Sequence, residues 1–183
     1  NIHSMQGVMG YYKHFIFNYA QITTSLTNLT KLHSLDIHWK DNAARSLHSF
    51  KSAIQTSPVL NIPNLSRPFT VYTDATDIDI GAVLVQRSAP EDHTTTHPIR
   101  FFSRTIPPPV KQYPLWEKEL YSLIQALREW RFYCSHPHSV IYTGHKGITH
   151  LLHHRMRHRT LHGRHTRWIA ELAEYQNKLQ WTP

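Results

Sequence analysis

The spacing of apolar residues changes at a turn-rich stretch between residues 58 and 68, and this change limits the possible folds more than any other feature. Upstream of it, apolar side chains recur every three or four residues, which is the period of an amphipathic helix. Downstream of it, residues 69–74 alternate and are rich in β-formers, which is typical of a strand. We therefore expect a helical part at residues 1–57 and a mixed α/β part at residues 58–183.

The helical part should consist of amphipathic helices. Val8, Tyr11 and Phe15 fall on one stripe of helical period, and a further helix is expected at residues 42–55 with Asp41 as its N-cap. The serine–proline pair that follows should end this helix, because the residue before a proline is disfavoured in the helical conformation.

The mixed part begins with strands and then alternates helix, strand and helix, which predicts a mixed sheet flanked by helices. Three consecutive prolines should form a stiff extended spacer before the first helix. The expected elements are strands at residues 69–74, 80–85, 99–103, 140–143 and 179–182, a spacer at 107–109, a helix at 116–130 and a last helix around Trp168 and Leu172.

Charge and composition narrow the possible partners and compartments. Twenty Lys and Arg residues against 12 Asp and Glu give a net charge of +8, which suits a polyanion such as nucleic acid. A basic domain without such a partner is the alternative. With no long apolar run, no signal-peptide pattern and one cysteine, we expect no membrane contact and an intracellular location, cytoplasmic or nuclear.

Two carboxylates stand out in the mixed part. Asp74 closes the first predicted strand, where a buried carboxylate is costly unless it is paired or bound to metal. Its alternative role is to cap the following turn. Glu119 lies at the edge of the apolar stripe of the 116–130 helix, where a solvated glutamate is the ordinary alternative.

An ordered series of motifs closely resembles the ribonuclease H domain of gypsy-type LTR-retrotransposon polyproteins. The first residues resemble the thumb-side end and linker of the same family's reverse transcriptase. The resemblance implies a ribonuclease H-like α/β fold, preceded by a small helical remnant, and metal-dependent cleavage of RNA in RNA–DNA hybrids. The motifs are residues 72–75, 80–84, 98–104, Tyr113 with 117–120, and 145–146, and at the front residues 5–7, 10–16, Trp39 and 57–60.

In this family four carboxylates hold two divalent cations, Mg²⁺ or in its place Mn²⁺. The resemblance assigns Asp74 and Glu119 as catalytic residues and metal ligands, with Glu117 as a second choice for the helix position. The third carboxylate should stand where this chain has Gly144, so this catalytic position is degenerate. The fourth should follow the last strand, and the sequence ends at Pro183, so we expect a C-terminally truncated domain.

With two of four ligands, the site should hold a cation weakly, and the chain should be a weak or inactive nuclease. The alternative is a non-catalytic, co-opted scaffold that binds nucleic acid or protein. Possible substitute ligands are His145, which is a poor magnesium ligand, and Asp77 and Asp79, which are better explained as turn formers.

A basic stretch near the C-terminus completes the predicted site. Five histidines there could bind a softer metal, but the interleaved arginines oppose a cation and favour contact with phosphates. A solvated basic connection is the alternative. The histidines are His153, His154, His158, His162 and His165, and the residues expected to bind nucleic acid are Lys146, Arg155, Arg157, Arg164 and Arg167.

Overall fold

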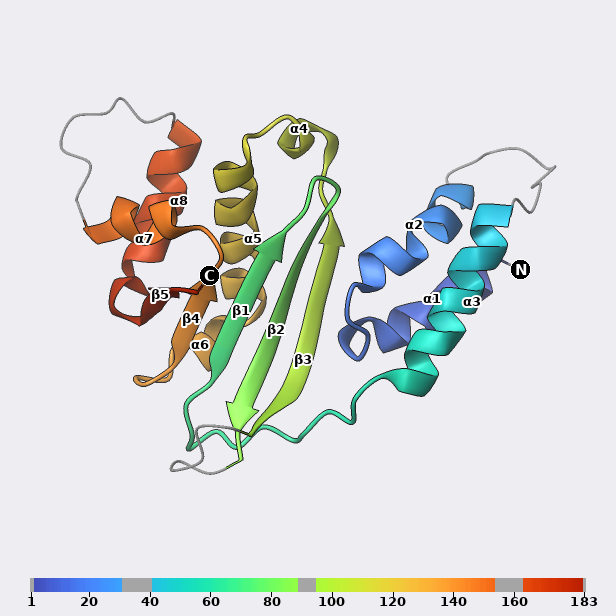
Figure 1. Cartoon of the computed structure of the whole chain (residues 1–183), viewed down its shortest axis with the longest axis horizontal. Helices are drawn as coiled ribbons and strands as arrows, with labels where there is room; N and C mark the ends of the chain where they lie inside the picture. Colours follow the sequence, from blue (N-terminus) through green and yellow to red (C-terminus); the bar gives the residue numbers. More distant parts are fainter. Residues whose placement is uncertain (1, 31–40, 89–94, 154–162, 183) are drawn as a thin grey trace.

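The computed structural model describes residues 2–30, 41–88, 95–153 and 163–182 and shows a five-stranded sheet in the order β3-β2-β1-β4-β5 (Figure 1). The first three strands are antiparallel to one another, whereas β4 runs parallel to β1 and β5 parallel to β4. The mixed sheet expected from the sequence is confirmed. Its strands are β1 (Thr70–Ala75), β2 (Asp79–Arg87), β3 (Thr96–Thr105), β4 (Val140–Thr143) and β5 (Leu179–Trp181).

The helices fall into two groups, one that precedes β1 in the chain and one that lies between β3 and β5. Figure 1 shows α5 lying along the sheet, with α7 and α8 beside it, while α1, α2 and α3 gather near β3. The first group is α1 (Ile2–Tyr11), η1 (Tyr12–His14), α2 (Tyr19–Leu29) and α3 (Asp41–Thr56), and the second is α4 (Pro108–Lys111), α5 (Leu115–Glu129), α6 (Arg131–Cys134), α7 (Lys146–His153), α8 (Gly163–Ala173) and η2 (Gln176–Lys178).

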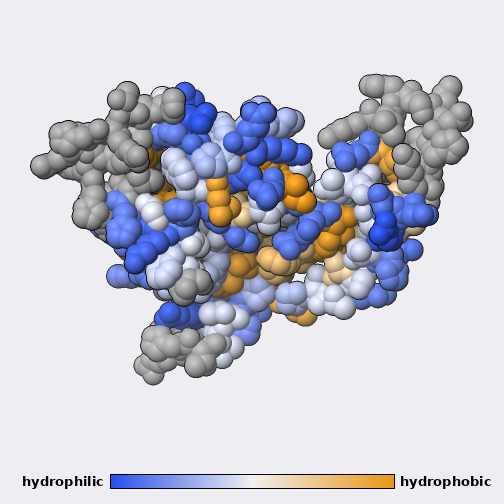
Figure 2. All heavy atoms as spheres, turned by 45° about the horizontal axis from the view of Figure 1, so that its top comes forward, coloured by the Kyte–Doolittle hydropathy of each residue, from blue (hydrophilic) through white to orange (hydrophobic). Residues whose placement is uncertain are grey.

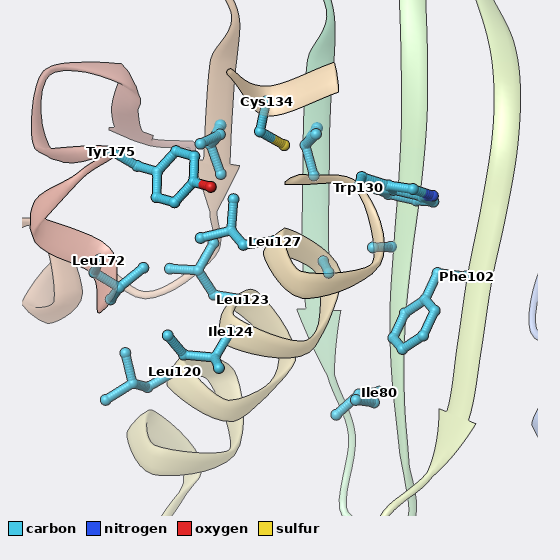
Figure 3. Packing of buried hydrophobic residues seen from close by; sticks show 14 of the residues in the cluster. Ile80, Phe102, Leu120, Leu123, Ile124, Leu127, Trp130, Cys134, Leu172 and Tyr175 are labelled. Atoms are coloured by element: carbon cyan, nitrogen blue, oxygen red, sulfur yellow. The ribbon is translucent and has the colours of Figure 1, made fainter. Parts of the chain in front are cut away.

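The main core lies between α5 and the sheet (Figure 3). The apolar stripe predicted for this helix is fully buried, and Trp130 at its end packs against Phe102 of β3 with ring centroids 6.3 Å apart. Burying each large aliphatic side chain contributes about 2 kcal/mol, so this stripe fixes α5 on the sheet. Its members are Leu120, Leu123, Ile124 and Leu127.

A second core holds the N-terminal helices together around Leu26 and Phe50. The helical stripe noted in the sequence faces outward instead: Val8 is 63% exposed and Tyr11 72% exposed. Met9, the neighbour of Val8, is buried in their place.

The helical group meets the sheet on the face opposite α5. Because Phe102 points toward Trp130, its neighbours on β3 point the other way. There the Phe101 ring meets Phe17 at 5.9 Å, and the Ala20 amide donates a 3.0 Å hydrogen bond to Ser103 Oγ. We call this side of the sheet the open face.

A pocket of about 280 Å³ lies between the start of α2 and the open face. Phe17 and Gln21 line it on the helical side, and Tyr72, Asp74 and Val83 line it on the sheet side. Figure 2 shows apolar side chains gathered in the hollow between the two parts of the molecule.

The structure corrects the prediction for the three prolines. Pro107 is extended, with ψ of 151°, but Pro108 and Pro109 begin the short helix α4. The fixed φ of proline suits the first turn of a helix, where the missing N–H would have no partner. Pro98 lies in β3, at the edge of the sheet beside a register shift opposite Leu84 and Val85, where a residue without an N–H is tolerated.

Candidate carboxylate site where β1 and β4 part

The parallel pairing of β1 with β4 ends at Thr73 and Thr143, so Asp74 and Gly144 are the next residues on the two chains. Asp74 is exposed and belongs to the open face, because burial alternates along β1. The carboxyl ends of parallel strands leave room between them at the point where pairing stops. This point is the candidate site.

Glu119 reaches this point from α5 and is buried, with 7% of its surface exposed. Burial, and second the negative charge of Asp74, raise the pKa of Glu119 to about 7, while the backbone of Ala75 lowers it. Among the described residues its Oε2 has no hydrogen-bond partner. A buried carboxylate oxygen without a partner is costly, and a bound cation would remove that cost.

Gly144 lies beside this carboxylate. A Cβ built at Gly144 would stand 3.9 Å from Glu119 Oε1 and would meet no other group within 4 Å apart from its neighbours in the chain. The backbone of Gly144 does not have a positive φ. A side chain at this position would therefore face Glu119 without backbone strain.

A serine that the sequence reading did not single out fixes the two carboxylates relative to each other. Ser122 Oγ donates a 2.8 Å hydrogen bond to the Asp74 carbonyl and lies 3.3 Å from the Gly81 carbonyl. Ser122 is one helical turn after Glu119, so the same face of α5 carries both. This i, i+3 spacing is the signal that could have identified it.

The other acidic candidates lie at the turn between β1 and β2. Asp77 accepts a 2.7 Å hydrogen bond from Lys118, which lowers the pKa of Asp77. Asp79 is buried at the start of β2, where its backbone bonds to the backbone and hydroxyl of Thr76 and closes the turn. Burial raises the pKa of Asp79, and its Oδ1, like Oε2 of Glu119, has no hydrogen-bond partner among the described residues. Within the described ranges, no three His, Cys, Asp or Glu side chains are grouped closely enough to hold a metal.

His145 is occupied locally, since its Nδ1 accepts a hydrogen bond from the Gly147 amide at the start of α7. Beside it, Lys146 is exposed and lies 5.4 Å from the centre of the Trp181 ring. The Trp181 indole N–H donates to the Gly144 carbonyl over 3.2 Å. Lys146 and Trp181 therefore flank the candidate site.

Glu117 points away from the site toward α8. Its Oε2 lies 2.8 Å from Arg164 Nη2 and 3.2 Å from Nε2 of the buried His165. On the same helix, Arg167 is exposed. The remaining basic and histidine candidates lie outside the described residues or have side chains that are not described; these are Arg155, Arg157, His153, His154, His158 and His162.

The mixed five-stranded sheet with its flanking helices is the fold of a ribonuclease H-like domain. The family described as the RNase H-like domain found in reverse transcriptase matches residues 64–175, and the chain belongs to this family. Two curated relatives from Drosophila melanogaster are the Retrovirus-related Pol polyproteins from transposons opus and 297. Each is 30% identical to this chain, over 97% and 98% of its length respectively. The matched regions make up 18% and 16% of the two relatives' own lengths.

A third relative, the Transposon Tf2-3 polyprotein of Schizosaccharomyces pombe, is 30% identical over 69% of this chain. The chain thus spans less than a fifth of the curated relatives described, and it is an RNase H-like domain of retrotransposon reverse transcriptase type. Families of this kind generally use divalent metal ions.

Solved structures share the fold over nearly the whole chain. The foamy viral protease-reverse transcriptase dRH in complex with double-stranded DNA matches 99% of this chain and 31% of its own, with a TM-score of 0.78 and 17% identity. The same viral protein in complex with an RNA/DNA hybrid matches 98% of this chain and 24% of its own, with a TM-score of 0.74 and 18% identity. No helix in the described part is both long and apolar enough to cross a membrane.

Proposed function

We propose that this domain binds RNA–DNA hybrids as part of a retrotransposon reverse transcriptase, with Asp74 and Glu119 as cation ligands and Gly144 at a position where a further carboxylate is expected. RNA cleavage should then be weak or absent. The observation that carries this proposal is the glycine at position 144, whose missing side chain would face Glu119 Oε1 from 3.9 Å.

The remaining pair can hold one divalent cation, Mg²⁺ or Mn²⁺. Asp74 offers an exposed carboxylate, and Glu119 offers a buried Oε2 that has no hydrogen-bond partner in the described structure. When bound, such cations activate a water molecule and stabilise the charge of the transition state. Without a carboxylate at position 144, these two side chains supply too few oxygens and too little charge for two Mg²⁺ ions, because magnesium otherwise keeps its waters.

The nucleic-acid partner is supported by charge and by the exposed basic side chains near the site. The net charge is +8, and Lys146 and Arg167 are exposed at α7 and α8. We include Arg155 and Arg157 in the proposed surface on sequence grounds. Arg164 is also predicted from the sequence to bind nucleic acid, and in the structure it contacts Glu117.

Two further parts of the proposal concern the whole chain. We propose that residues 1–57 form a thumb and linker segment and that residues 58–183 form the ribonuclease H-like domain, which agrees with two separate cores. We also propose an intracellular location, in the cytoplasm or nucleus, where an RNA–DNA hybrid would be met.

The test is an assay of a labelled RNA–DNA hybrid with Mg²⁺ and, separately, with Mn²⁺. The proposal predicts hybrid binding with cleavage barely above background, and loss of any residual cleavage in Asp74→Asn. Strong Mg²⁺-dependent cleavage that Asp74→Asn abolishes would overturn the inactive reading and would make Asp79 and Asp77 the next candidate ligands. Absence of hybrid binding at low salt would favour the alternative, a co-opted scaffold.

A further inference from the structure

Helix α8 is seated on α5 by an ion pair near each of its ends. Arg164, in the first turn of α8, contacts Glu117 at 2.8 Å, and Glu171 receives two hydrogen bonds from Arg128 at 2.8 and 2.9 Å. Between them, the Trp168 ring packs against Tyr121 of α5 and against Tyr113, which precedes α5. The two helices therefore form one packed unit.

Glu117 is the buried member of this arrangement, with 8% of its side chain exposed. A buried carboxylate requires a partner, and Oε2 of Glu117 has two neighbours on α8, Arg164 Nη2 and His165 Nε2. The Arg164 guanidinium also lies 4.2 Å from the centre of the Tyr113 ring. Arg164, whose side chain is 41% exposed, thus has both a carboxylate and an aromatic ring as partners.

We propose that Glu117 and Arg164 are a positioning pair that holds the first turn of α8 against the first turn of the helix carrying Glu119. Arg164 contributes to nucleic-acid binding through this contact and does not itself bind phosphate. The inference rests on the proposed function, because its consequence for binding requires that the domain binds hybrids. Through this pair, α8 presents its exposed Arg167 at a fixed place relative to Glu119.

The direction in which Glu117→Gln changes hybrid affinity distinguishes this role from direct phosphate binding. If Arg164 bound phosphate, Glu117 would only neutralise it, and Glu117→Gln would strengthen hybrid binding. If the pair positions α8, the same substitution weakens hybrid binding, because the buried contact is lost. The two roles predict opposite directions.

The experiment measures hybrid affinity over a series of salt concentrations for Glu117→Gln, Arg164→Met and the double variant. We expect each single variant to lose about three- to tenfold in affinity and the double variant to lose no more than the larger single loss, because contacting residues couple. The slope of log affinity against log salt should stay unchanged. Additive losses, or tighter binding by Glu117→Gln, would overturn the proposal.

A second ion pair supplies matched controls. Arg131 and Glu174 are 3.6 Å apart and both exposed, so Glu174→Gln and Arg131→Met make the same charge changes without breaking a buried contact. These variants should change hybrid affinity less than twofold at moderate salt. Equal losses in both pairs would show a general charge effect and contradict the positioning role.

Hydrogen exchange tests the positioning role without nucleic acid, and therefore independently of the proposed function. Hydrogen exchange of the α8 amides, compared with those of β1, should rise about tenfold in Glu117→Gln and in Arg164→Met but not in the control pair. If the wild-type chain binds no hybrid yet α8 loosens as expected, the proposed function fails and the pairing stands. If Glu117→Gln does not fold, Arg164→Met decides, because a phosphate contact would lower the salt slope by about 1 and a positioning contact would not.

Discussion

Ser122 Oγ donates a 2.8 Å hydrogen bond to the Asp74 carbonyl, so the helix that carries Glu119 is tied directly to the strand that carries Asp74. Ser122 is fully buried, and the bond spans 48 residues of sequence. The relative placement of the two carboxylates therefore depends on a neutral side chain that takes no part in binding a cation.

Removing this bond should destabilise the fold. Ser122→Ala leaves buried carbonyl oxygens of β1 and β2 without this donor, and the expected loss is about 1–3 kcal/mol in the free energy of unfolding. Urea denaturation measures it. The matched control is Ser135→Ala, whose hydroxyl bonds an exposed carbonyl and whose loss should cost about 0.5 kcal/mol or less. Equal losses at the two serines would contradict a tie between α5 and β1.

Glu119 should make stability depend on pH. Burial raises its folded pKa to about 7 from an ordinary value of 4.5, so its contribution to stability is fully present below pH 4.5 and is lost as pH rises through 7. Glu119→Gln removes this dependence. Relative to wild type, the variant should gain about 2–3 kcal/mol in unfolding free energy between pH 5 and pH 8.

The measurement is urea unfolding of both proteins at pH 5 and pH 8 without divalent cations. Glu174→Gln is the control, since Glu174 is 61% exposed and does not face Asp74. Its effect should be small at both pH values. If the stability of Glu119→Gln relative to wild type is the same at both pH values, Glu119 is not a buried carboxyl with a raised pKa.

Binding of hybrids should weaken steeply with salt, and Lys146 and Arg167 should each account for about one phosphate contact. Replacing either with alanine should reduce the slope of log affinity against log salt by about 1 and weaken binding to all sequences alike. Arg131→Ala, at an exposed arginine of α6, should leave the slope unchanged. Slopes that stay at the wild-type value in both Lys146→Ala and Arg167→Ala would place the nucleic-acid surface elsewhere.

Much of the fold could be predicted from the sequence because its signals are local. The alternating strands, the apolar stripe of α5 and the break after Ser57 each follow from neighbouring residues, and the structure contains all three. The outward-facing side chains of Val8 and Tyr11 could not be predicted, because periodicity gives a stripe but not the surface it meets. The helix begun by Pro108 was missed because a proline run suits both a spacer and a helix start.

Some features of the candidate site could be predicted from the sequence, and others could not. Asp74 and Glu119 were identified through the family resemblance, and the structure shows that the charge of Asp74 acts on Glu119. Their role as metal ligands stays a prediction. The partners of Glu117 could not be derived from sequence, because Arg164 and His165 are 47 or more residues away and the contact depends on how α8 docks.

We predict that position 144 is the vacant place of a carboxylate ligand. The measurement is a calorimetric Mn²⁺ titration of wild type, Gly144→Asp and the neutral Gly144→Asn at pH 8, above the raised pKa of Glu119. Gly144→Asp should bind Mn²⁺ at least about tenfold more tightly than wild type, since a third oxygen ligand joins the pair, and Gly144→Asn should gain much less. Equal Mn²⁺ affinity in Gly144→Asp and wild type, with both proteins folded, would contradict it.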